Sequence, residues 1–171
     1  MRLFLSWKHI ISLCFVLLHL SLSIAHATVV PKQHRLLIIN SYNEGAPWSQ
    51  TLITPIMLQT SSIEDVSADL VHINGTFIRN DSLYNQMEEG IFQRYEKNKP
   101  DYLVLIGSIA FTLRDRIQKE WGDIPMILIA NEDTYAPREY YFTGRSINMA
   151  DNKVAPLNDI REQYNFTFIE T

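Results

Sequence analysis

Short runs of apolar residues alternate along the chain with longer segments that have helical spacing. Three runs are apolar at nearly every position and predict strands that are buried on both faces of a sheet; they span residues 35–40, 102–106 and 125–130. Residues 68–73, the second strand in chain order, alternate between apolar and polar side chains. That alternation predicts a strand nearer the edge of the sheet.

The segments between these strands predict helices. Residues 48–61 carry an apolar stripe, and we expect Pro55 inside it to kink the helix or to delay its start. The helix after the second strand is expected to be capped by Asp81 or Ser82. The predicted apolar face of this second helix consists of Leu83, Met87, Ile91 and Tyr95. That of the third helix consists of Leu113, Ile117 and Trp121, and Arg114 is among its polar positions.

Strand–helix–strand repetition at this spacing predicts an α/β fold with a doubly wound, mostly parallel sheet. We expect the strand order 2-1-3-4 and helices on both faces, a three-layer α/β/α arrangement. The tail is expected to differ: residues 135–151 are polar and rich in turn-forming residues, residues 156–164 predict a short helix, and residues 166–169 predict a further strand.

Residues 1–27 have the features of a cleaved signal peptide. A basic start is followed by a mainly apolar run of about 15 residues, which is short for a membrane span, and Ala25-His26-Ala27 has the small-x-small pattern of a cleavage site. Export to the periplasm or another extracytoplasmic compartment is therefore expected. The alternative is an uncleaved membrane anchor; lipid anchoring at Cys14 is disfavoured because Leu13 is too large for that cleavage site.

Removal of the leader changes both the charge and the cysteine content of the chain. Residues 28–171 retain 13 basic against 19 acidic residues, a net charge of −6, which argues against nucleic acid as a partner. They contain no cysteine, which excludes disulfides, thiol catalysis and cysteine metal sites. We expect one domain that is stabilised by its core alone, without a cofactor.

Ligands of open parallel sheets bind at the carboxyl ends of the strands, where the strand order reverses. The residues after the four predicted strands combine hydroxyls, amides, a glycine and aromatic rings, which suits a pocket for a small polar molecule. The predicted ligand-binding residues are Ser41, Tyr42, Trp48, Asn74, Gly107, Ser108, Asn131 and Glu132. The alternative is that the serine, asparagine and glycine residues only cap helices and form turns.

The same segments do not predict an enzyme. Gly107-Ser108 lacks the Gly-x-Ser-x-Gly context of a nucleophile elbow, and residues 28–171 contain two histidines, His34 and His72. His34 precedes the first strand, and His72 is expected to be a packed or exposed strand residue. Neither a Walker-type loop nor a Gly-x-Gly-x-x-Gly motif is present. Glu132-Asp133 is interpreted as a solvated turn; the alternative is an acid–base dyad or a cation site. No metal site is predicted.

Three phrases of the sequence resemble periplasmic-binding-protein-like domains, which occur in ABC-type substrate-binding proteins and in the extracytoplasmic sensor domains of histidine kinases. These phrases are residues 36–48, which contain Asn-Ser-Tyr and Pro-Trp, residues 100–110, and residues 125–131. Residues 156–165 are similar to the crossover that leads toward the second lobe in sensors of the Bacteroides type.

This resemblance implies a two-lobed clamp that closes on a small molecule. Residues 28–155 would form the N-terminal lobe, of the type I kind, and residues 156–171 would begin a crossover to a second lobe that is missing here. By resemblance, Ser41, Trp48 and Ser108 would contact the ligand, which the sequence leaves open among sugars, amino acids and nucleobases. We expect a truncated sensor lobe of a two-component system; the alternatives are a transporter's solute-binding component and an exported scaffold without a small-molecule role.

Overall fold

The computed structural model describes residues 33–130, 134–135, 155–156 and 166–170, all of which belong to the compact unit Gln33–Thr171. The expected leader, the helix expected over residues 157–164, and the candidate site residues Asn131 and Glu132 lie outside these ranges. None of the described helices is long and apolar enough to cross a membrane.

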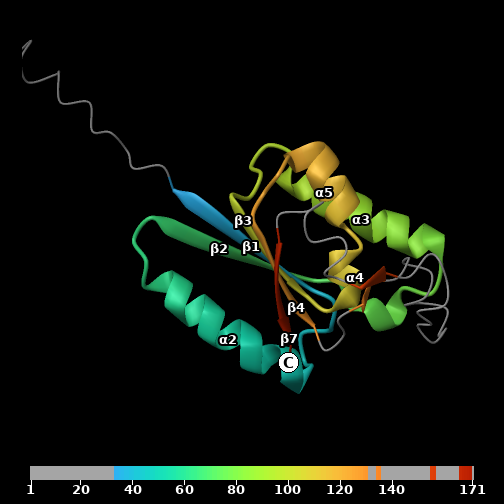
Figure 1. The fold of residues 1–171 in the computed structure, drawn as a ribbon, viewed down its shortest axis with the longest axis horizontal. Helices are drawn as coiled ribbons and strands as arrows, with labels where there is room; N and C mark the ends of the chain where they lie inside the picture. The colour runs from blue at the N-terminus through green and yellow to red at the C-terminus, as the bar shows by residue number, and fades with distance from the viewer. Residues whose placement is uncertain (1–32, 131–133, 136–154, 157–165, 171) are drawn as a thin grey trace, which may run out of the picture. The chain divides into compact units, whose positions relative to one another are not determined.

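Five strands form one parallel sheet in the order β2-β1-β3-β4-β7 (Figure 1). The strands are β1 His34–Asn40, β2 Val66–His72, β3 Tyr102–Ile106, β4 Met126–Ala130 and β7 Phe166–Glu170. The α/β class with a parallel sheet is thereby confirmed, and so is the strand expected over residues 166–169. Pro156 was expected to begin a helix, and this was wrong: it pairs with Thr134 in a short antiparallel ladder of β5 Thr134–Tyr135 and β6 Ala155–Pro156.

The helices cover the two faces of the sheet unequally (Figure 1). They are α2 Pro47–Ser61, α3 Asp81–Tyr95, α4 Ser108–Phe111 and α5 Arg114–Trp121, with a 3₁₀ turn at Gly75–Phe77. Helix α2 packs on one face, and α3, α4 and α5 pack on the other. This follows from chain direction, because β1→β2 runs one way across the sheet and β2→β3→β4 the other, so crossovers of one handedness lie on opposite faces.

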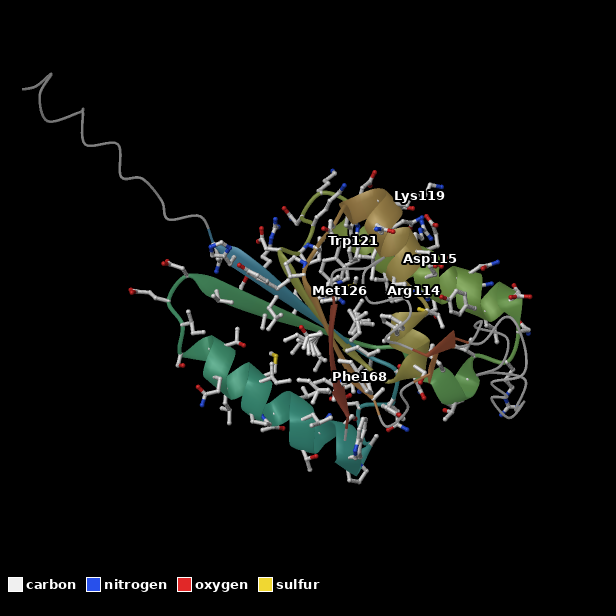
Figure 2. The ribbon with its side chains drawn as sticks, in the orientation of Figure 1. Arg114, Asp115, Lys119, Trp121, Met126 and Phe168 are labelled. Carbon is white, nitrogen blue, oxygen red and sulfur yellow. The ribbon has the colours of Figure 1, made fainter. Side chains whose placement is uncertain are left out.

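Alternate residues of each strand supply the two cores. Leu37, Leu105 and Leu128 face α3 and α5, whereas Ile38, Val104 and Ile129 face α2. Figure 2 labels Trp121, Met126 and Phe168, which join the larger core from α5, β4 and β7. Continuous apolar runs are therefore explained by burial on both sides, as expected for a parallel sheet.

Helix α3 corrects two details of the sequence analysis. Its N-cap is Asn80 rather than Asp81 or Ser82, and the Asn80 Oδ1 accepts a hydrogen bond of 3.0 Å from the Leu83 N–H. Leu83 is exposed, and Tyr84 is buried in its place. Because 3.6 residues complete a turn, a strict spacing of four rotates about 40° per step and leaves the buried stripe. The buried face of α3 consists of Tyr84, Ile91, Phe92 and Tyr95, with Met87 packed against it.

Pro55 and Arg114 also differ from expectation. Helix α2 begins at Pro47 and continues through Pro55, which lies on its exposed side, so Pro55 does not delay the start of the helix. Arg114 was expected at a polar position of α5 but is buried. Its guanidinium carbon lies 5.2 Å from the centre of the Phe111 ring, and Nη2 is 3.5 Å from the Asp115 carboxylate. These two contacts compensate the buried charge.

Arg116 ties α5 to α3 at the surface. Its guanidinium lies 4.3 Å from the centre of the Phe92 ring and forms ion pairs of 2.8 Å with Glu89 and 2.7 Å with Glu120. The hydrogen bond from Arg116, with a further one from Gln93, holds the pKa of the exposed Glu89 carboxyl below its ordinary value. These interactions of Arg116 therefore hold the two helices together. They have a structural role and do not create a reactive group.

Among the described residues, α2 is the helix on its face of the sheet, and it leaves part of that face uncovered. Beside α2, over β3, β4 and β7, lies a largely apolar cavity of about 700 Å³. Its walls include Leu52 and Ile56 of α2 and Val104, Ile127 and Ile169 of the sheet. Ile127 and Ile169 are exposed, so burial on both faces is complete for the last four residues of β1 and incomplete for β4 and β7.

Gly90 and Gly122 offer a matched test of backbone conformation. A Cβ at either residue would meet no atom within 4 Å, but Gly122 has φ = +94° whereas Gly90 lies inside α3. We expect Gly90→Ala to raise the free energy of unfolding by about 0.5–1 kcal/mol, because alanine loses less backbone entropy in a helix. Gly122→Ala should lower it by about 1–3 kcal/mol, because this backbone region disfavours residues with a Cβ. Urea unfolding measures both; a loss of stability in Gly90→Ala would contradict the placement of α3.

Candidate functional site

The carboxyl ends of β1, β2 and β3 lie level with one another. Asn40, the last residue of β1, is in register with His72 of β2 and Ile106 of β3. The chain then leaves β1 toward α2 on one face and leaves β3 toward α4 and α5 on the other. The carboxyl ends of β1 and β3 thus mark the point at which connections diverge, the usual position of a ligand in an open parallel sheet.

The Asn40 side chain is fully buried at this point and is hydrogen-bonded at both ends of its amide. Its Oδ1 accepts from the Tyr42 N–H at 3.3 Å, and its Nδ2 lies within hydrogen-bond distance of three acceptors. These acceptors are the Tyr42 carbonyl at 3.3 Å, the Ser49 Oγ at 3.2 Å and the His72 Nδ1 at 2.9 Å. One amide therefore joins the loop after β1, the first turn of α2 and the end of β2.

Ser41 forms a second junction beside Asn40. Its N–H donates to the Ile106 carbonyl at 2.8 Å, and its carbonyl accepts from the Gly75 N–H at 2.8 Å. Its buried Oγ accepts from the Ala110 N–H at 2.8 Å, inside α4. The Ser41 side chain thus holds α4 against β1 and lies beneath the surface on which a ligand would rest.

Gly107 allows this close packing. It has φ = +82°, and a Cβ at this position would come within 2.9 Å of both the Ser41 side chain and the Tyr42 ring. A side chain would therefore collide with both neighbours in a backbone region that already disfavours L residues. The absence of a side chain at residue 107 lets the Tyr42 ring approach the end of β3.

Tyr42 and Trp48 form an aromatic pair at the surface of this junction. Their ring centres are 5.1 Å apart with an interplanar angle of 71°, a T-shaped contact. Each residue remains 36% exposed. The intervening loop is fixed by hydrogen bonds from the Ala46 N–H to the Asn43 carbonyl and from the Gln50 Nε2 to the Glu44 carbonyl. The rings are thus held in place and still offer surface to a ligand.

The structure brings together six of the eight residues that the sequence nominated. Ser41, Tyr42, Trp48 and Gly107 form one contiguous group through the contacts above. The partly exposed Ser108 directly follows Gly107 at the start of α4. Asn74 joins the group through the Gly75–Ser41 hydrogen bond and has a left-handed backbone with φ = 54°. The apolar cavity beside α2 has none of these residues in its walls.

Sequence reasoning missed the polar residues that organise the site from below. Asn40 was taken only as the end of a strand, Ser49 only as part of a helix, and His72 as an ordinary strand residue. The signal that could have found Asn40 is its position: an amide that ends an otherwise fully apolar buried run needs partners in the fold. His72 ends β2 at the carboxyl edge and is one of those partners.

Comparisons with protein-family models, with curated proteins and with solved structures found no match for this chain. Within the described ranges, no group of three or more His, Cys, Asp or Glu side chains could hold a metal ion. The chemistry of the carboxyl edge therefore has to be argued from its own residues: an exposed aromatic pair resting on a saturated polar network.

Asn40→Ala should lower the free energy of unfolding by about 1–3 kcal/mol, because the fully buried Ser49 hydroxyl and the Tyr42 N–H and carbonyl lose their partner. It should also change the fluorescence of Trp48, whose neighbour Tyr42 these bonds position. Asn43→Ala is the matched control in the same loop, where the side chain is exposed, and should change stability by less than about 0.5 kcal/mol. Urea unfolding followed by fluorescence compares the two; equal effects would show that Asn40 does not organise the site.

Proposed function

We propose that this chain is an extracytoplasmic ligand-binding lobe, with a three-layer, type I periplasmic-binding-protein-like arrangement, that takes up a small polar molecule at the carboxyl ends of β1 and β3. Its role is binding rather than catalysis. Of the candidate residues, Tyr42, Trp48, Ser108 and Asn74 would face the ligand, while Ser41 and Gly107 would position them.

The observation that carries this proposal is the exposed Tyr42–Trp48 pair at the divergence point of the sheet. Large aromatic residues are favoured inside a core, and a pair held at the surface by a buried network is typical of a recognition surface. Its position coincides with the place where open parallel sheets bind ligands. A turn that only capped helices would require neither exposed ring.

The sensor role is the part of the proposal that depends most on resemblance. It is supported by the similarity of residues 156–165 to the crossover of sensor lobes, together with the apolar leader that argues for export. In a sensor, closure of a second lobe over the first would convert binding into a signal. The proposal therefore treats Tyr42 and Trp48 as half of a pocket.

A thermal-shift titration of the full chain with glucose, leucine and adenine tests the binding claim. A molecule that binds the folded state should raise the melting temperature with dose, by roughly 5–10 °C at a hundred times its dissociation constant. Trp48→Ala and Ser108→Ala should each reduce this shift. Tyr102→Ala is the matched control, since Tyr102 is an exposed aromatic at the opposite end of β3. Equal loss in Tyr102→Ala would place binding elsewhere.

Mass spectrometry of the full chain expressed in a bacterium tests export. We expect the mature protein to begin at Thr28, because Ala25 and Ala27 supply the small residues that the cleavage site requires. Ala27→Leu should block this cleavage, while His26→Leu, between the two alanines, should not. A chain that keeps residues 1–27 in the membrane fraction would instead establish an uncleaved anchor.

A further inference from the structure

The Tyr42 and Trp48 rings determine what this site can recognise. The two planes are inclined at 71°, and each residue keeps more than a third of its surface exposed. The face of an aromatic ring is electron-rich and attracts cations, most strongly for tryptophan. The edge-to-face contact leaves part of each residue exposed, and an exposed ring face can contact a compact cationic group.

The hydrogen-bonding groups beneath the rings are already engaged. The Asn40 amide is occupied at both ends, and the Ser41 Oγ accepts from the Ala110 N–H. Recognition of a neutral sugar depends on several free and directional donors and acceptors. Binding at this site would therefore depend more on the aromatic surfaces than recognition of a sugar does.

The charge of the surrounding segments favours the same class of ligand. Residues 41–46, 73–77 and 107–108 contain one carboxylate, Glu44, and neither lysine nor arginine. Glu44 is exposed in the loop that separates Tyr42 from Trp48, and the Gln50 side chain holds its backbone carbonyl at 2.7 Å. These segments hold no counter-ion for an anionic ligand, whereas Glu44 supplies a negative charge in the loop that links the two aromatic residues.

We propose that the Tyr42–Trp48 pair, with Glu44 as the counter-charge, binds a quaternary ammonium group. The inference rests on the binding function proposed above and names the chemical class of its ligand. A quaternary ammonium group has no N–H to donate, so it is recognised by ring faces and charge alone, which matches a site whose polar groups are engaged internally.

Choline and 3,3-dimethylbutan-1-ol provide a matched pair of probes, because they share size and shape and differ in charge. Titration of the full chain, followed by calorimetry, should show choline binding about tenfold or more tightly than the neutral alcohol. Trp48→Ala should weaken choline binding by about 2- to 30-fold, and Trp48→Phe, which keeps a ring, by less. Glu44→Gln, an exposed change that leaves the fold intact, should weaken choline binding and reduce its dependence on salt.

Tyr102→Ala serves as the control and should leave choline affinity unchanged. Equal affinity for choline and for the neutral alcohol would overturn the inference, because the site would then recognise shape without charge. If choline does not bind but glucose, leucine or adenine does, the binding function survives and the cationic class is wrong. Failure of all these probes, on a chain that unfolds cooperatively, would count against both.

Discussion

The buried side-chain amide of Asn40 makes hydrogen bonds to three separate segments of the chain. It engages the Tyr42 backbone, the first turn of α2 and the end of β2, and the adjacent Ser41 engages β3, α4 and the turn at Gly75. A buried polar group without partners raises the free energy of the folded state, so each of these segments is held in one position. The residues beneath the surface of the carboxyl edge are consequently fixed in position, and the aromatic pair packs on them.

The position of the Tyr42 ring depends on packing above this network. Because residue 107 has no side chain, the ring lies against the end of β3, and Trp48 then packs against it. The backbone conformation at Gly107 thus determines where the two aromatic rings lie. The pair is held in place by contacts within the chain, which would lower the entropic cost of the proposed binding.

The sequence was sufficient to predict the repeated strand–helix units of the fold. Continuous apolar runs located β1, β3 and β4 because burial on both faces requires them, and the alternation in residues 68–73 located the edge strand β2. The buried faces of the helices were harder to predict. Leu83 is exposed and Tyr84 is buried, because the packing of the helix decides which residues of the 3.6-residue period form the buried stripe. The aromatic pair was found from its position after β1, whereas the Asn40 network was not. Hydrogen-bond partners such as Asn40 and His72 are separated by 32 residues and become neighbours only through strand register.

The partly bare face beside α2 has a thermodynamic consequence. The heat-capacity change of unfolding arises mainly from apolar surface that becomes newly hydrated. Ile127 and Ile169, in the walls of the cavity beside α2, are already in contact with water in the folded chain. For the part of the chain that the structure describes, unfolding therefore hydrates less additional apolar surface than it would if this face of β4 and β7 were covered. The exposed face lowers the heat-capacity change of unfolding and makes stability vary less with temperature.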